Sequence, residues 1–435
     1  MTPGARLAAA TEILGAIEAA WRSGGAAADS IVEGYFRKRR YAGSHDRRWI
    51  IAEVYAALRE RGLRLWRLAA EGLEATAERQ VLLGLLCAGD IDPAWFGGPH
   101  SLPSPSGEEL AALRRAAQRE GAPPAARHNV PDWLFDRLAT RFGAALEREM
   151  AALAARAPLD LRVNTARIGR RRVLEQLADS GLKAQPTPWS PLGIRIEESR
   201  NIKGHALFQK GLVELQDESS QLATLLCGVR PGEQVADLCA GAGGKTLALS
   251  ALMQGRGQIF AFDTDRRRLS ALRTRARRAD VRNLQAHPLA ADADLRMAQL
   301  EAHRGHFDLV VVDAPCSGSG TWRRNPDLRW RFAPDDLARI AARQRALVAE
   351  AMTLARPQGR VAYMTCSLLT EENEAVVEEA LANHAGWRLV DFREAWAETI
   401  GGEAPESAAG PPATLQLTPA RHGCDGFFFA LMARG

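Results

Sequence analysis

Two cysteines of this chain lie in polar segments that follow apolar strands, where a thiol could take part in chemistry. The expected strand 308–312 runs into Asp313-Ala314-Pro315-Cys316-Ser317-Gly318, and the expected strand 361–364 runs into Thr365-Cys366-Ser367. Open α/β sheets place their active sites at the carboxyl ends of such strands. We therefore expect both thiols at that edge rather than in the core, where a cysteine packs as a small apolar side chain.

A glycine-rich turn follows another expected strand, 235–238, and precedes an expected helix over 247–253. The turn consists of Cys239, Ala240, Gly241, Ala242, Gly243, Gly244 and Lys245. Because glycine has no Cβ, a ligand can approach the backbone closely, and N–H groups at the helix start point toward it. A phosphate-binding P-loop would need glycine at position 239, which is cysteine, so the turn favours a nucleoside-containing cofactor.

The next expected strand, 258–262, ends at Asp263, about one β-α-β unit after the glycine turn. A carboxylate at this place can accept hydrogen bonds from both hydroxyls of a ribose. The turn and the acid alone would also fit a dinucleotide-dependent dehydrogenase. The two cysteine segments decide against that alternative.

A thiolate beside a nucleoside-containing cofactor that can donate a methyl group would suit methylation of cytosine at carbon 5. That carbon is too weakly nucleophilic to take a methyl group directly, so a thiolate must first add at carbon 6 and form an enamine. Loss of the proton on carbon 5 then expels the thiol, which must be ionised at neutral pH to start the reaction. Asp313 could hydrogen-bond the N3 and N4 edge of the base. Methylation of an exocyclic amine needs no thiol, which counts against that class.

The chain length and the pattern of expected helices and strands indicate several domains. A length of 435 residues exceeds one ordinary hydrophobic core. Residues 1–130 have helical periodicity and end in a Pro- and Gly-rich linker, and residues 131–212 mix short strands with helices. From 213 to 435, strands alternate with amphipathic helices, which specifies a mostly parallel sheet wrapped by helices. Residues 401–418 look like a mobile surface loop.

Composition excludes several classes of protein. The six cysteines lack C-x-x-C spacing and are too sparse for a disulfide framework, so we expect no zinc site and no other metal. Neither a long apolar run nor an N-terminal leader is evident, so we expect a soluble cytoplasmic protein without membrane contact. The net charge of +5 is modest, but basic residues cluster at 37–40, 47–48 and 266–268. Such clusters suit a polyanion and also occur on ordinary solvated helices.

Taken together, these residues resemble the RsmB/Nop2/Sun family of RNA 5-methylcytosine methyltransferases, over most of residues 130–435. The N-terminal helices, with Tyr41-Ala42-Gly43-Ser44-His45-Asp46-Arg47-Arg48, resemble the NusB-like RNA-binding domain of its bacterial ribosomal RNA members. The matching segments are 215–221, the turn 239–245, 313–318, Arg324-Asn325-Pro326-Asp327, Thr365-Cys366-Ser367 with Glu371-Glu372-Asn373-Glu374, and Asp425-Gly426-Phe427-Phe428.

The resemblance implies a Rossmann-like class I methyltransferase domain with a mostly parallel seven-stranded sheet, and S-adenosylmethionine as the cofactor. It implies that Cys366 is the nucleophile and that Cys316 assists release of the methylated product. Residues 239–245, Asp263 and Asp313 would line the cofactor site. The expected partner is RNA, first of all 16S ribosomal RNA, and we expect a monomer.

One segment departs from the family pattern. After the expected strand 283–286 the family usually has Gly-Asp, whereas this chain has Pro288-Leu289-Ala290-Ala291-Asp292. Either Asp292 contacts the adenine or that contact is made differently. Two other functions stay open, namely methylation of transfer RNA and a catalytically silent ribosome-assembly factor. The intact set of cysteines, aspartate and glycine turn disfavours the silent factor.

Overall fold

The structure, a computed structural model, describes residues 1–22, 24–89, 91–197, 202–410 and 412–435. It forms two compact units. The first contains residues 1–154 together with 322–333, and the second contains 155–321 together with 334–435. The segment 322–333 therefore packs with the N-terminal helices although it follows the Pro-Cys segment in sequence. The division into three domains that we expect from the sequence stays a prediction.

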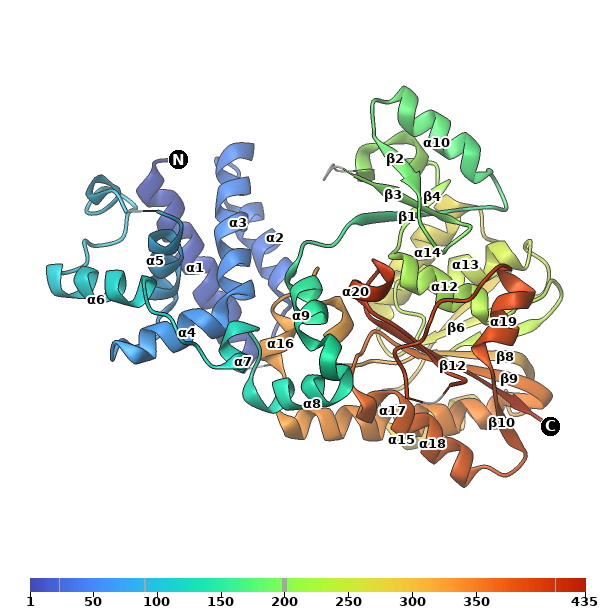
Figure 1. The fold of residues 1–435 in the computed structure, drawn as a ribbon. Coiled ribbons are helices and arrows are strands. Elements are labelled where there is room, and N and C mark those ends of the chain that lie inside the picture. Colours follow the sequence, from blue (N-terminus) through green and yellow to red (C-terminus); the bar gives the residue numbers. More distant parts are fainter. Residues whose placement is uncertain (23, 90, 198–201, 411) are drawn as a thin grey trace. The chain divides into compact units, whose positions relative to one another are not determined.

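The first unit is all-helical among the described residues (Figure 1). Its apolar positions recur on one face of each helix, for example Ile13 and Ile17, or Ile50, Val54 and Leu58, and these side chains are buried in one core. Its α-helices are α1 (Pro3–Arg22), α2 (Ala28–Lys38), α3 (Ser44–Arg59), α4 (Arg61–Ala70), α5 (Ala77–Ala88), α6 (Gly107–Ala117), α7 (Pro124–Arg127), α8 (Asp132–Phe142), α9 (Leu146–Ala154) and α16 (Leu328–Arg331).

The second unit begins with a small antiparallel sheet in the order β2-β3-β1-β4. Alternate side chains of its strands, such as Leu161, Val163 and Ile194, are buried against two helices. Its elements are β1 (Leu159–Val163), α10 (Arg170–Asp179), β2 (Ala184–Pro186), β3 (Gly193–Ile196), α11 (Ala206–Gln209) and β4 (Val213–Leu215).

The larger sheet has the order β10-β12-β9-β8-β5-β6-β7, with β11 added beside β12. Strands β5 to β9 pair in parallel, and β12 pairs antiparallel with β9, β10 and β11. The expected Rossmann-like, mostly parallel sheet is thus confirmed, but among the described residues it has eight strands rather than the expected seven, because β11 is added beside β12. The strands are β5 (Gln234–Asp237), β6 (Gln258–Asp263), β7 (Leu284–Pro288), β8 (Phe307–Asp313), β9 (Ala355–Thr365), β10 (Trp387–Val390), β11 (Leu415–Leu417) and β12 (Phe427–Arg434).

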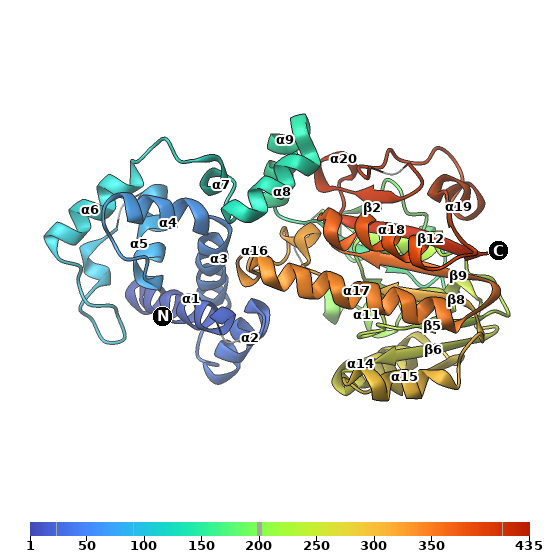
Figure 2. The same cartoon turned by 90° about the horizontal axis from the view of Figure 1, so that it is seen from below.

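Helices cover both faces of this sheet (Figures 1 and 2). Alternate strand residues face opposite ways, so that Val235 packs toward one helix layer and Ala236 toward the other. The first layer contains α12 (Glu218–Leu226), α13 (Gly244–Leu252), α14 (Arg266–Ala279) and α19 (Phe392–Thr399). The second contains α15 (Ala293–Glu301), α17 (Pro334–Leu354) and α18 (Glu374–Asn383).

Part of the expected loop 401–418 is a strand. Leu415, Gln416 and Leu417 form β11, are buried, and pair with β12, and α20 (Pro419–His422) follows. Because the segment is rich in Gly, Pro and Ala, its composition does not indicate that three of its residues form a strand of the sheet. Among the described helices, none combines the length and apolarity that crossing a membrane requires.

Candidate active site at the carboxyl edge of the large sheet

The glycine turn joins β5 to α13 through backbone that only glycine adopts easily. Gly241 has φ +55° and Gly243 has φ +85°. A Cβ on Gly243 would lie 2.8 Å from Cδ1 of Leu272 in α14, whereas a Cβ on Gly241 would meet nothing closer than 3.9 Å. The turn is therefore packed tightly against α14 at Gly243 and open at Gly241. A ligand can approach the backbone there and meet the start of α13.

Asp263 is held beside this turn by the parallel pairing of β5 with β6. Its Oδ2 atom accepts a hydrogen bond from the N–H of Gly241 at 2.8 Å, and Oδ1 accepts one from the N–H of Asp265 at 2.7 Å. Each carboxylate oxygen can accept a second hydrogen bond. The carboxylate is thus fixed at the turn with capacity left for ligand hydroxyls.

Two arginines, of which Arg162 is buried and Arg275 is half-buried, support the turn from the protein side. The guanidinium of Arg162 in β1 donates to the carbonyl of Gly244, and that of Arg275 in α14 donates to the carbonyl of Ala242 at 2.7 Å. Glu214 in β4 pairs with Arg275 at 2.9 Å. Burial lowers the pKa of Arg162 to about 10, and Glu214 opposes that shift. The sequence does not predict a role for these arginines, because only the folded small sheet and α14 bring them to the turn.

Lys245 links the glycine turn to the cysteine segments. Its Nζ atom lies 2.7 Å from Oδ2 of Asp313, at the end of β8, and 5.0 Å from the centre of the Phe427 ring. The ion pair and the cation–π contact hold the side chain between the turn and the end of β8. Asp313, Lys245 and the turn therefore form one continuous polar edge.

The two predicted cysteines lie together at this edge. Strands β8 and β9 are parallel neighbours, and the Sγ atoms of Cys316 and Cys366 are 3.2 Å apart. Both side chains are half-buried rather than sealed in the core. The contact with Cys366, burial, and the negative field of Glu372 all raise the pKa of Cys316. Either thiol can donate the hydrogen bond between the two sulfurs.

Glu372, in the 3₁₀ turn η5 (Thr370–Glu372), accepts hydrogen bonds from the serines that follow the two cysteines, a role that the sequence does not predict. Burial raises the pKa of its carboxyl group, against hydrogen bonds that lower it. The available signal was its place in the acidic segment after Thr-Cys-Ser. An acidic run usually indicates a solvated helix face, yet Glu372 is completely buried.

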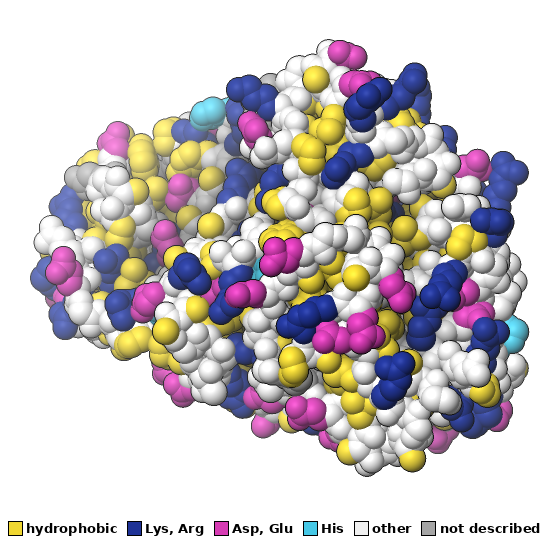
Figure 3. All heavy atoms as spheres, turned by 45° about the vertical axis from the view of Figure 1, so that its right-hand side comes forward, with side chains coloured by type: hydrophobic (Ala, Val, Ile, Leu, Met, Phe, Trp, Pro, Cys, Tyr) yellow, Lys and Arg dark blue, Asp and Glu magenta, His cyan; other side chains and the backbone are white. Residues whose placement is uncertain are grey.

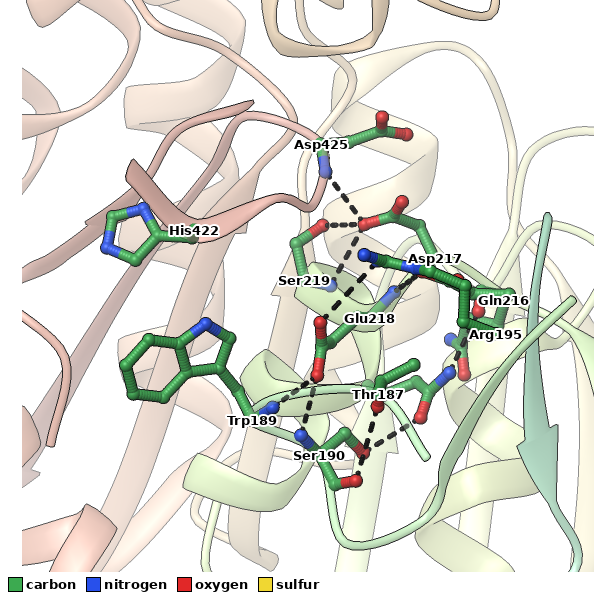
Figure 4. Close-up of polar contacts among 12 residues, drawn as sticks. Thr187, Trp189, Ser190, Arg195, Gln216, Asp217, Glu218, Ser219, His422 and Asp425 are labelled. Carbon is green, nitrogen blue, oxygen red and sulfur yellow. Dashed lines mark hydrogen bonds and ion pairs between the residues drawn. The ribbon is translucent and has the colours of Figure 1, made fainter. Parts of the chain in front are cut away.

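Figure 4 shows the polar contacts of Gln216, Asp217 and Glu218, which follow β4 and lead into α12. Glu218 accepts the N–H groups of Trp189 and Ser190 at 2.6 and 2.8 Å. Asp217 accepts the N–H of Asp425 at 3.0 Å, which ties the start of α12 to the segment before β12. These contacts explain the segment as structural support for the site.

Two predicted cofactor residues have local structural roles. Asp292 is exposed, and its Oδ1 atom caps α15 by accepting the N–H of Leu295 at 3.0 Å. Its contact with an adenine stays a prediction. The thiol of Cys239 packs against the core beneath the sheet edge, and burial raises its pKa. Among the described residues, no group of three or more His, Cys, Asp or Glu side chains is arranged to hold a metal ion.

Two family models match parts of this chain, and curated relatives are similar to it. Residues 224–433 match the model of 16S rRNA methyltransferase RsmB/F, and residues 130–203 match the RsmF/B-like ferredoxin-like domain. The ribosomal RNA small subunit methyltransferase B of Xanthomonas campestris is 34% identical over 76% of this chain and 72% of that protein. A probable enzyme of the same name from Synechocystis is 32% identical over 70% of this chain and 66% of that protein.

Solved structures share the fold. A methyltransferase homolog protein from Pyrococcus horikoshii has a TM-score of 0.61 and 29% identity over 72% of this chain and 97% of its own. The crystal structure of PH0851 has a TM-score of 0.77 over 99% of both chains at 24% identity, which shows likeness of fold alone.

Proposed function

Because the chain belongs to the RsmB/F family of 16S rRNA methyltransferases, we propose that it transfers a methyl group from S-adenosylmethionine to carbon 5 of a cytosine in RNA. The first candidate substrate is 16S ribosomal RNA, the molecule that the family description names. The observation that carries the proposal is the 3.2 Å contact between the thiols of Cys316 and Cys366, beside the Lys245–Asp313 pair. Methyl transfer to an exocyclic amine needs no thiol, so it would not explain why two thiols lie together here.

The donors and acceptors at the turn fit S-adenosylmethionine. The open backbone at Gly241 admits a close ligand, and Asp263 can accept ribose hydroxyls. When bound, the cofactor supplies an electrophilic methyl group on a sulfonium. Gly241 and Asp263 would hold the nucleoside, and Asp313 would lie between cofactor and base.

The two thiols have different roles in the remaining steps, which are attack on the base and release of the product. The thiolate of Cys366 forms a bond to carbon 6 of the cytosine, and the electron pair moves toward carbon 5, which becomes nucleophilic. After methylation, a base takes the proton from carbon 5, the bond between carbon 6 and sulfur breaks, and its electron pair returns to Cys366. Cys316 is next to that sulfur and assists release. Asp313 would hydrogen-bond the N3 and N4 edge of the base.

We also propose that the first unit contributes to RNA binding. A groove of about 410 Å³ between α2 and α3 has an apolar floor of Val32, Phe36 and Ile51, and is lined also by Glu33, Arg37, Arg40 and Arg47. Tyr41, close by in sequence, is 72% exposed. Arginines bind phosphates, and exposed aromatic rings stack on unpaired bases. On the face drawn in Figure 3, basic side chains are interspersed with acidic and apolar ones, so charge alone does not trace an RNA path there.

The proposal is tested by methyl transfer with purified protein. Labelled S-adenosylmethionine is supplied with 16S ribosomal RNA, transfer RNA, DNA or a protein mixture, and the RNA is digested to nucleosides for mass spectrometry. We expect label only in 5-methylcytidine from RNA, and bisulfite sequencing then locates the base. Label in an N-methylated nucleoside would overturn the proposal, and label in transfer RNA alone would reassign the substrate.

A further inference from the structure

One carboxylate contacts both cysteine segments. Ser317 and Ser367 each follow a cysteine, and both hydroxyl groups donate to Oε2 of Glu372 at 2.5 Å. The N–H of Ser317 donates to Oε1 at 2.8 Å, and Nε2 of Gln344 donates to the same oxygen at 3.1 Å. Two segments 50 residues apart in sequence are therefore held on a single side chain.

The four donors explain why a carboxylate occupies this position. Glu372 is 0% exposed, and burying a carboxylate costs several kcal/mol unless hydrogen bonds replace water. Two oxygens that accept two hydrogen bonds each meet that need. An amide has one oxygen and would turn an NH₂ group toward donors. A carboxylate at position 372 can therefore accept the hydrogen bonds from both segments.

Direct bonds between the segments add to the arrangement. The N–H of Gly320 donates to the carbonyl of Cys366 at 2.9 Å, and the N–H of Leu368 donates to Oγ of Ser319 at 2.8 Å. Asn373, next to Glu372, donates through Nδ2 to the carbonyl of Ser367 at 3.0 Å. The backbones of both cysteine segments are thus fixed by these bonds as well as by the carboxylate.

We propose that Glu372 is a positioning residue for the thiol pair, which sets the separation of Cys316 and Cys366 through Ser317 and Ser367. Its effect on catalysis rests on the proposed function, and its effect on the thiols does not. Replacing the carboxylate with an amide leaves one oxygen for the four donors, so the tether between the two segments loosens. The two sulfurs then lose their 3.2 Å contact.

The test compares Glu372→Gln with Glu378→Gln, a matched change at an exposed carboxylate of α18. For Glu372→Gln we expect kcat to fall by at least tenfold while the KM for S-adenosylmethionine stays within twofold. The rates at which iodoacetamide labels Cys316 and Cys366, read by mass spectrometry, should also change relative to each other. Glu378→Gln should match the wild type in all three measurements. A folded Glu372→Gln protein with wild-type kcat and wild-type labelling rates would overturn the proposal.

Single-serine variants keep the test valid if Glu372→Gln fails to fold. Ser367→Ala should slow formation of the covalent protein–RNA adduct, and Ser317→Ala should slow its decay, since each removes the tether of one cysteine. Identical kinetics in both variants and the wild type would contradict the proposal. Thiol labelling needs no RNA, so altered labelling without cytosine methylation would refute the proposed function and leave the positioning role standing.

Discussion

The Nζ atom of Lys245 lies 2.7 Å from Oδ2 of Asp313, so the first turn of α13 is bound to the end of β8. This pair joins the proposed cofactor turn to the segment that carries Cys316. Both side chains are held where a methyl donor and a base would meet.

We expect Lys245→Met to lower kcat/KM by about 10²-fold, the usual cost of removing one preorganised charged group from a reaction centre. The physical reason is that Asp313 loses its partner and its fixed orientation. Methyl transfer to RNA at saturating S-adenosylmethionine measures the effect. Lys245→Arg is the control, because it keeps the charge, and it should retain more activity than Lys245→Met. Equal activity of the methionine variant and the wild type would show that the pair is not needed.

The thiols should have separable roles. Cys366→Ala should abolish methyl transfer, because no sulfur remains to bond carbon 6. Cys316→Ala should accumulate a covalent protein–RNA adduct, because release from Cys366 stalls. A denaturing gel with labelled RNA detects the adduct as a slow-migrating band. Near-normal transfer by Cys366→Ala would reverse the assignment of the two thiols, and absence of the adduct in Cys316→Ala would remove the release role.

The tight packing at Gly243 predicts that a side chain there would clash with Leu272. Gly255 also has a positive φ but has no close neighbour, so it serves as the matched control. Gly243→Ala places a Cβ 2.8 Å from Leu272 in addition to the backbone strain at φ +85°, whereas Gly255→Ala has φ +68° and meets nothing within 4 Å. The strain alone costs about 1–2 kcal/mol in each variant. We expect Gly243→Ala to unfold more easily than Gly255→Ala and to bind S-adenosylmethionine more weakly, by urea titration and calorimetry. Equal losses would mean that the contact with Leu272 relaxes freely.

Stability should fall as the pH rises toward neutrality. Burial raises the pKa of Asp237 from 3.8 to about 7, so the folded protein binds a proton that the unfolded chain releases. This contribution is complete below pH 3.8 and is lost as the pH rises to about 7. Between pH 5 and pH 8 it amounts to about 3 kcal/mol.

Asp237→Asn cannot titrate, and its side-chain oxygen can still accept the hydroxyl of Thr246. Urea unfolding at pH 5 and pH 8 without cofactor should therefore show a smaller decline for this variant than for the wild type. The buried carboxyls Glu218 and Glu372 add to the wild-type slope and stay in both proteins. Identical declines would exclude Asp237 as the titrating group.

The sequence predicts the site residues that follow strands and misses those that support them. Asp263, Asp313, Cys316 and Cys366 could be placed at one edge, because the carboxyl ends of parallel strands meet there. Glu372 contacts Ser317 across 55 residues, and no local periodicity records such a pairing. The same holds for Arg162, which reaches Gly244 across 82 residues. Residues 415–417 form a strand because β12 offers a partner, which their own composition does not indicate.

The groove between α2 and α3 predicts a salt-dependent contribution to RNA affinity. The double variant Arg37→Glu/Arg40→Glu should weaken RNA binding at least tenfold at low salt, and should lower the slope of log affinity against log salt by about 2, because two phosphate contacts are lost. Binding of S-adenosylmethionine should not change. Arg230→Glu is the control, since that side chain is 74% exposed in the second unit. Fluorescence anisotropy with a ribosomal RNA fragment measures both quantities, and equal RNA affinities of the double variant and the wild type would exclude the groove from the RNA-binding surface.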